Sequence, residues 1–146
     1  MTIKDFQKQI ANALGGVEEL VQGGCKAFAE DMLTTQNALN NAVVTAGRIA
    51  VVVVTPRLNR DAGGCADGLP SDVSLLVSCI EAPAHRDKRN GFTALDAAEI
   101  IAHALDSETV NWRSIEQRSD EARGVITATA EFGVSVILSN PTNERN

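Results

Sequence analysis

Alternating hydrophobic and polar positions near the C-terminus mark the clearest element of the chain. Between Gly124 and Leu138, every second residue is apolar and most of the residues between them are polar or small. This alternation is typical of a strand with one buried and one exposed face. At about 3.3 Å per residue the strand would be roughly 45 Å long. We therefore expect part of it to project beyond the domain or to pair with a neighbouring subunit.

Two further strands are apolar on both faces. Residues 48–56 are dominated by β-branched side chains, which favours an interior strand that is covered on each side. Residues 72–81 form the second such strand, in which Leu76 and Ile80 mark one face. The other face carries Val73, Leu75, Val77 and Cys79.

Two weaker strand signals complete the predicted sheet. Residues 25–30 alternate and suggest a short edge strand, on which Lys26 would face solvent as a guard against edge pairing. Residues 109–119 suggest a more polar strand. Trp112 and Ile115 lie an odd number of positions apart, so both can face the core only if the strand contains a bulge.

Helical periodicity appears in the N-terminal third. Residues 2–14 carry one apolar stripe and begin with a Thr2-x-x-Asp5 capping box, and a shorter helical piece is expected at 17–21. Residues 31–46 predict another helix, with Gly47 well placed just beyond its end.

The helix predicted at 93–105 follows a capping box made by Thr93 and Asp96. Its many alanines indicate close packing against a flat surface, most plausibly the sheet. The expected buried stripe consists of Leu95, Ala98, Ala102 and Leu105, and it is widened by Ala94, Ala97, Ile101 and Ala104.

The predicted order of elements is α-(β)-α-β-β-α-β-β. It indicates an α+β fold with a mostly antiparallel sheet of four to five strands and about three helices packed on one side of it. Residues 1–138 are expected to form a single domain, and residues 139–146 a flexible polar tail.

Two polar connectors are candidate contact surfaces. Residues 57–70 predict a long loop rich in Gly, Asp and Asn, and residues 82–92 predict a polar connector between strand and helix. The connector's basic cluster either binds an anion or an acidic partner surface, or is simply solvated. Arg57 and Arg60 of the loop would enlarge this cluster if the fold brings them near it. The candidate assembly-contact residues are Arg57, Arg60, His85, Arg86, Lys88 and Arg89.

Composition narrows the range of partners and locations that we expect for this protein. The net charge of −6 and the aromatic content of 3% argue against a default nucleic-acid partner, since acidic surfaces repel phosphates and stacking platforms need aromatic rings. The longest apolar run, residues 49–54, is too short to span a membrane. The odd number of widely spaced cysteines suggests reduced thiols in a cytoplasm.

The sequence signals for catalysis and for metal binding are weak. Glu99 and His103 have the i, i+4 spacing of metal ligands, but a solvated helix face explains them better. Cys79 lies in an apolar strand, where a thiol is inert. The Gly63-Gly64 pair lacks the Lys-Ser/Thr of a phosphate-binding loop. We therefore expect no enzyme activity, no cofactor and no metal.

The order of these patterns resembles the tail-terminator or minor tail proteins of long-tailed bacteriophages. The resembling segments cover about two thirds of the chain and end in a late long strand that contains Phe132. They are IAVVVVTPRLNR, then DVSLLVSCIEAPAHRDKRNGFTALDAAEIIAHAL, then GVITATAEFGVSVIL. The second segment contains a strand that ends in Glu-x-Pro, an Asn/Arg-rich connector and a T-A-L-D-A-A-E helix. The connector departs from the family pattern where His85 and Asp87 interrupt its basic run.

The resemblance implies a small α+β virion protein without catalytic residues. Members form a homo-hexameric ring on the head-proximal end of the tail tube. The ring stops growth of the tube and joins it to the head-side connector. A basic cluster facing the ring lumen would touch DNA, and one facing outward would touch protein. Such a protein would be made in the host cytoplasm, would act in the virion and would bind no membrane.

Two other functions stay open at this point. The nearest is another neck or head–tail joining protein of the same virion. The second belongs to a different class, a bacterial ligand-binding or enzymatic α+β domain that uses residues 57–70 and the basic connector as its site.

Overall fold

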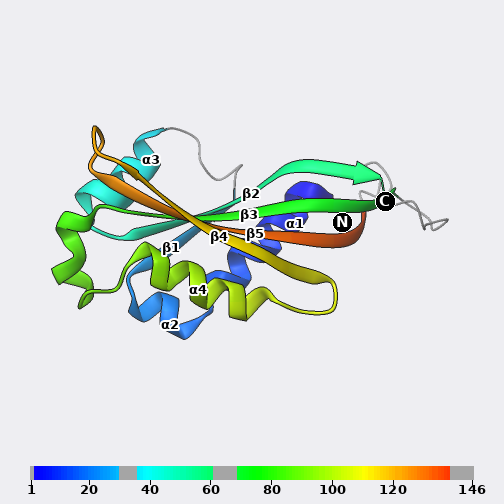
Figure 1. The fold of residues 1–146 in the computed structure, drawn as a ribbon, viewed down its shortest axis with the longest axis horizontal. Coiled ribbons are helices and arrows are strands. Elements are labelled where there is room, and N and C mark those ends of the chain that lie inside the picture. The colour runs from blue at the N-terminus through cyan, green and yellow to red at the C-terminus, as the bar shows by residue number, and fades with distance from the viewer. Residues whose placement is uncertain (1, 30–35, 61–68, 139–146) are drawn as a thin grey trace.

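The computed structural model describes residues 2–29, 36–60 and 69–138. Its centre is one five-stranded mixed sheet with strand order β1-β2-β3-β5-β4, flanked by helices (Figure 1). This architecture confirms the predicted α+β class. The strands are β1 (Cys25–Ala29), β2 (Ile49–Arg60), β3 (Leu69–Glu81), β4 (Val110–Asp120) and β5 (Val125–Leu138).

The β1–β2 pair is parallel, and every other pair of neighbouring strands is antiparallel. β1 lies at one edge of the sheet, as its alternating sequence predicted, and Lys26 on it is exposed. β1 pairs with β2 only from Ile49 to Val53. The remainder of β2 therefore has a partner on one side only among the described residues.

The helices begin and end close to where the sequence places them. Helix α1 (Ile3–Gly15) starts at a capping box of Thr2 and Asp5, and α2 (Glu18–Gln22) follows it. Helix α4 (Ala94–Leu105) starts at the predicted capping box of Thr93 and Asp96. In each box the Thr hydroxyl accepts the Asp backbone N–H, and the Asp carboxylate accepts the Thr backbone N–H. Two of the otherwise unpaired N–H groups of each helix start are satisfied in this way.

The helix predicted at 31–46 is only partly described and is not uniform. Helix α3 (Gln36–Asn40) continues directly into a π-helical turn, η2 (Asn41–Thr45), and residues 31–35 lie outside the described residues. Gly47 follows with a φ of 70°, which fits its predicted place just beyond the helix end.

Helices cover both faces of the sheet, which corrects the expectation that they would share one side. α1, α2 and α4 pack over the main core, and α3 with η2 packs on the opposite face. The physical reason lies in β2, where Ile49, Val51 and Val53 point into the main core. Ala50 points to the other face of the sheet. Ala42 and Val43 pack against that face and keep Ala50 buried.

The loop predicted at 57–70 is largely strand at its two ends. β2 continues to Arg60 and β3 begins at Leu69, and the two pair as far as Arg60 with Ser71. The sequence suggested that Pro56 ends the strand. Instead, a register irregularity between Val54 and Arg57 lets the strand continue past the proline. Residues 61–68 lie outside the described residues.

β5 is as long as its alternation predicted. It pairs with β3 from Ile126 to Leu138 and with β4 as far as Val134. The strand therefore finds partners along its whole length within this chain, so the expectation that part of it projects beyond the domain is wrong. Its inward side chains Ala128, Ala130, Phe132 and Val134 are buried in the main core.

Candidate assembly surfaces

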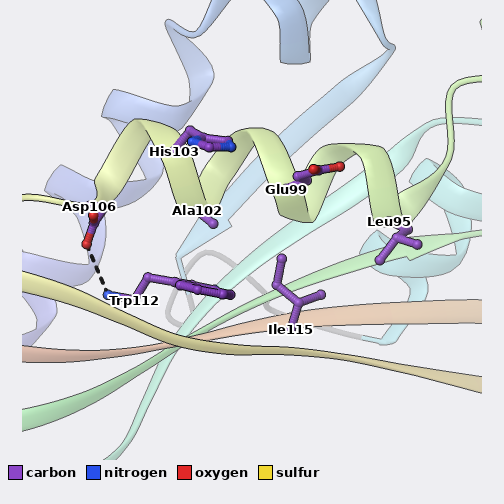
Figure 2. Close-up of a pocket in the computed structure, with 7 residues that line it drawn as sticks. All are labelled: Leu95, Glu99, Ala102, His103, Asp106, Trp112 and Ile115. Carbon is purple, nitrogen blue, oxygen red and sulfur yellow. Dashed lines mark hydrogen bonds between the residues drawn. The ribbon is translucent and has the colours of Figure 1, made fainter.

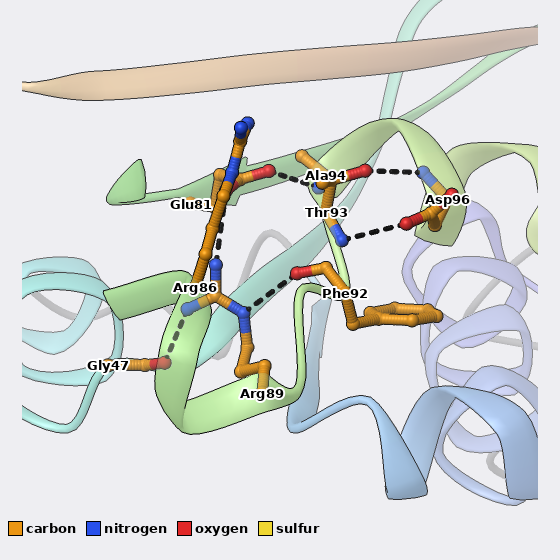
Figure 3. A network of polar contacts seen from close by, with 8 residues as sticks. All are labelled: Gly47, Glu81, Arg86, Arg89, Phe92, Thr93, Ala94 and Asp96. Carbon is orange, nitrogen blue, oxygen red and sulfur yellow. Dashed lines mark hydrogen bonds and ion pairs between the residues drawn. The ribbon is translucent and has the colours of Figure 1, made fainter. Parts of the chain in front are cut away.

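The connector after β3 is organised around one buried carboxylate. Glu81, the last residue of β3, is 0% exposed. Its Oε1 accepts hydrogen bonds from Arg86 Nε at 2.7 Å and from Arg89 Nη2 at 3.1 Å (Figure 3). Its Oε2 accepts the backbone N–H of Ala94, in the first turn of α4. A buried charge is tolerated only when it is paired and hydrogen-bonded, and each oxygen of this carboxylate has a donor.

Arg89 extends this network to the start of β2. Its Nη1 donates to the carbonyl of Gly47 at 2.7 Å, and its Nε donates to the carbonyl of Phe92 at 3.2 Å. The residue is only 6% exposed. The sequence placed Arg89 on a contact surface, but the structure buries it. The reason is that Glu81 continues the inward-facing set of β3 and needs a cation beside it.

The segment that carries these arginines is a 3₁₀-helix, η3 (Pro83–Arg89), where the sequence predicted an irregular connector. Arg86 lies at its surface, with a side chain that is 38% exposed, and its hydrogen bond to Glu81 raises the pKa of its guanidinium. His85 contacts the carbonyl of Val44 through Nε2 at 2.8 Å, so it joins η3 to η2. Lys88 is exposed.

Arg57 and Arg60 do not extend this basic cluster. In the sheet register Ala50 lies opposite Ile80, beside the connector, whereas Arg57 lies opposite Ser74. Seven residues of strand correspond to roughly 23 Å. Arg57 is exposed towards the far end of β2, and Arg60 occupies its last position, with a side chain outside the described set. The six candidate residues therefore divide between the two ends of the sheet.

A second surface, which the sequence did not indicate, is a groove of about 500 Å³ between α4 and β4 (Figure 2). Leu95 and Ala102 line it from the helix, and Trp112 and Ile115 line it from the strand. Its polar lining comes from Glu99, His103 and Asp106. The groove is thus apolar with two carboxylates along it.

A bulge in β4 builds the strand side of this groove. The β4–β5 register shifts between Trp112 and Ser114, so that Trp112 lies opposite Phe132 and Ile115 opposite Ala130. Phe132 and Ala130 both face the main core, so Trp112 and Ile115 both point towards α4. Their odd spacing allows them to share one face only across a bulge, and the structure contains that bulge. The backbone N–H of Trp112 also donates to Asp106 Oδ1 at 3.2 Å, which ties the strand to the end of the helix.

Leu95 is the residue that sequence reasoning misplaced here. The expected buried stripe of α4 included it, but its exposed fraction is 44%, while Ala94, Ala97 and Ile101 are fully buried. The stripe is therefore rotated so that alanines meet the sheet and Leu95 lies over the groove. Trp112 is 49% exposed, although a lone tryptophan in a chain of small apolar residues would be expected in the core.

Titratable residues elsewhere do not gather into a metal site in the part of the chain that the structure describes. Asp96, one turn before Glu99, caps α4 as its sequence position predicted. Cys25 and Cys79 are buried and unbridged, and burial raises the pKa of both thiols, that of Cys25 to about 12. Such thiols are poor nucleophiles. Cys65 and the Gly63-Gly64 pair lie outside the described residues.

In comparisons with known proteins, no family model matches the sequence and no curated protein matches it. Within the described residues, no helix has the length and apolar character needed to cross a membrane.

Proposed function

We propose that this chain is a structural assembly protein, the tail terminator of a long-tailed bacteriophage. In this role it forms a homo-oligomeric ring, for which the family resemblance implies six subunits. The ring sits on the head-proximal end of the tail tube, stops its growth and provides the joint to the head-side connector. The resemblance of the three sequence segments named above is the starting point of the proposal.

The observation that carries the proposal is the pair of unpaired margins of the sheet. At one margin β4 is almost entirely exposed and, in the part of the chain that the structure describes, pairs only with β5. At the other, β2 beyond Val53 pairs only with β3 among the described residues. Unpaired strands on opposite sides of one sheet are a liability in a monomer, but they suit a subunit that contacts one neighbour on each side.

Exposed apolar side chains add to this argument. Leu58, Trp112 and Ile137 are each about half exposed, at 48%, 49% and 54%. Leu58 lies on β2, Trp112 on β4 and Ile137 on β5. Single exposed apolar residues are common, but residues next to unpaired strand margins favour contacts with other chains.

Fewer of the basic residues can act as contact residues in this proposal than the sequence suggested. Lys88 and Arg57 remain available to a tube protein, a head-side partner or lumenal DNA, because both are exposed. Arg86 and Arg89 are occupied by Glu81. In the proposed role the protein acts in the virion, after synthesis in the host cytoplasm.

A test uses the full chain with purified tail tube protein. Native mass spectrometry and negative-stain imaging are expected to show a six-fold ring, and tubes assembled with the protein are expected to be capped at one end and uniform in length. Tubes that grow to the same lengths with and without the protein would rule out a terminator.

Another neck or head–tail joining protein would fit the same sheet margins. Binding to head-side proteins but not to the tube end would indicate that role. The α4–β4 groove favours a ligand-binding domain as a candidate of a different class, because its volume of about 500 Å³ lies in the range of small-molecule sites. A monomer that holds a tight small-molecule ligand would support this candidate and contradict the terminator.

A further inference from the structure

The α4–β4 groove lies at an open margin of the sheet. β4 is the last strand in the sheet order, and α4 packs over β3, β5 and β4. The groove between α4 and β4 therefore opens beside the outer edge of β4 (Figure 2). A pocket next to the free edge of a strand allows an extended segment of another protein to add to the sheet and to place alternate side chains in the pocket.

The outer edge of β4 is closed only at its first residues. The backbone N–H of Trp112 donates to Asp106, and the backbone N–H of Val110 donates to the Ser107 hydroxyl at 3.2 Å. Beyond the bulge, residues 114–120 pair with β5 alone in the part of the chain that the structure describes. The backbone groups on the outer edge of this segment are therefore open to a further strand.

The groove face of β4 is apolar and uncharged. Ile115 lies between Trp112 and Leu95 along the groove (Figure 2). The register continues this face through Gln117, which lies opposite Ala128 in the main core. A strand added beside β4 would point every second side chain towards this face and towards α4.

The cations of β4 lie on the opposite face of the sheet. The guanidinium of Arg113 lies against Gly133, which points away from the main core because its neighbour Phe132 points into it. Glu116 and Arg118 alternate with the groove-facing positions, and they pair with each other at 3.1 Å. No basic side chain of β4 therefore faces the groove.

The helix side of the groove is anionic. Glu99 and Asp106 are exposed along it, and His103 is the only other titratable residue of the lining. Residues 91–112, which include all of α4, contain no lysine or arginine. Within the described residues Glu99 makes no hydrogen bond or ion pair, so its carboxylate is available to a cation.

The charges of this chain favour a basic partner over a second copy. Arg86, near the start of α4, is bound by Glu81 and does not neutralise the groove. The whole chain has a net charge of −6, so a second copy would bring more acids than bases to a surface that already lacks bases. The best occupant carries a cation for Glu99 and apolar side chains for Trp112 and Ile115.

We propose that an extended, basic segment of a partner protein pairs with the free edge of β4. An arginine or lysine of this segment faces Glu99. Apolar side chains at the alternate positions on either side of it pack against Trp112 and Ile115. A cation beside the face of a tryptophan ring is attracted by that ring as well. The inference stands without the terminator role, because it requires only the groove and the free strand edge.

Short synthetic peptides serve as probes of this site. The parent peptide is Ser-Thr-Leu-Thr-Arg-Thr-Leu-Thr-Ser, which in an extended conformation places Leu and Arg on one face and Thr on the other. The set replaces Arg by Lys and Leu by Val or Phe, and a matched peptide has Glu in place of Arg. By fluorescence anisotropy of labelled peptides with the full chain, we expect saturable binding of basic peptides. Binding of the Glu peptide should be at least about tenfold weaker.

Trp112 reports occupancy of the groove directly, because the chain has no other tryptophan and no tyrosine. Its emission should shift to shorter wavelength as an unlabelled basic peptide covers the ring. Glu99→Lys should weaken binding at least about tenfold. The control is Glu121→Lys, which makes the same change in net charge in the exposed turn after β4 and should leave binding unchanged. Both positions are exposed, so the folds should persist, and circular dichroism with thermal melting checks that they do.

Backbone pairing is tested separately from side-chain docking. Alternate N–H groups of an extended peptide point to opposite edges, so only one set can donate to β4. Two further peptides carry N-methyl groups on one set or on the other. We expect one pattern to abolish binding and the other to preserve most of it. An equal effect of the two patterns would show that the peptide does not pair as a strand.

The remaining outcomes that overturn the inference are equally definite. Absence of saturable binding across the whole set of basic peptides would remove the site, and equal binding of the Arg and Glu peptides would remove its charge preference. A shift of Trp112 emission with protein concentration, without any peptide, would make a second copy the occupant. Capping of tail tubes tests the terminator role independently of all these measurements.

Discussion

Glu81 and Arg89 form an ion pair with 3.1 Å between Oε1 and Nη2, and both side chains are buried. The pair joins the end of β3 to the segment that leads into α4, and Arg89 carries the link on to Gly47 before β2. The end of β3, the segment before α4 and the more distant start of β2 are thus tied at one point.

Removing either partner should destabilise the fold strongly. We expect Arg89→Met or Glu81→Gln to lower the free energy of unfolding by about 3–5 kcal/mol, because the remaining charge or its neighbours stay buried without a partner. Lys88→Met, one position away and exposed, should change it by less than about 0.5 kcal/mol. Urea unfolding followed by circular dichroism measures both. Equal effects of Arg89→Met and Lys88→Met would show that the pair is not a structural tie.

Lys88 allows the contact role of the connector to be tested without unfolding the protein. Under the proposed function, Lys88→Glu should weaken capture of the tube or of the head-side partner while leaving the melting temperature unchanged. Reversal of Arg86 and Arg89 together with Lys88 would not separate contact from folding, because Glu81 binds both arginines. Pull-down with each partner is the measurement, and Lys88→Ala, which removes the charge without reversing it, should weaken capture less than Lys88→Glu. Unchanged capture of every partner would leave the connector as a structural segment only.

Gly23 should not tolerate a side chain, although its φ of −75° is ordinary. A Cβ there would lie 2.5 Å from two atoms of the Phe92 ring. We expect Gly23→Ala to lower the free energy of unfolding by about 1–3 kcal/mol, as overpacking does.

Gly133 provides the contrast for that measurement. A Cβ at this position would also meet an atom at 2.5 Å, but the atom belongs to the guanidinium of Arg113, at the end of a flexible side chain. Gly133→Ala should therefore cost less than Gly23→Ala in the same thermal or urea unfolding experiment. The reverse order would mean that the Phe92 ring moves aside more easily than Arg113.

Alkaline conditions should destabilise the fold through the two buried thiols. Burial raises the pKa of Cys25 from 9.0 to about 12, and raises that of Cys79 as well. Above pH 9 the unfolded chain loses thiol protons that the folded chain retains, so stability is complete below that pH and falls as pH rises towards 12. The slope is at most about 1.4 kcal/mol per pH unit for each thiol.

Urea unfolding between pH 8 and 11 measures this slope, with Cys25→Ser and Cys79→Ala as variants that should each reduce it. In the native protein we also expect the peptides containing Cys25 and Cys79 to be alkylated slowly. Rapid labelling of both at neutral pH would contradict their burial.

The elements whose pattern depends on local chemistry were predictable from the sequence. The Thr2 and Thr93 capping boxes fix the starts of α1 and α4, and the parity of Trp112 and Ile115 required the bulge in β4. The alternation of β5 gave both its length and its buried face. Each of these signals is set by neighbours within a few residues, so the sequence carries it directly.

The tertiary relationships were not predictable in this way. Arg89 looks like a solvated cation until the register of β3 brings Glu81 into the core beside it. The groove depends on the rotation of α4 about its axis, and both faces of that helix are rich in alanine, so Leu95 could be assigned to either side. Arg57 and His85 are brought to different ends of the sheet by β2–β3 pairing, which no local pattern encodes.

The central β3–β5 pair also affects the order in which the sheet can fold. Ser78 and Thr129 are hydrogen-bonded across this pair although they are 51 positions apart, because η3, α4 and β4 are all inserted between the two strands. Contacts between residues so far apart in sequence form slowly, since the intervening loop must close first. While β5 is still inside the ribosome, the emerging chain lacks the strand that lies between β3 and β4 in the sheet. We therefore expect folding of the sheet to be completed only after β5 has been synthesised, although the other four strands precede it in the chain.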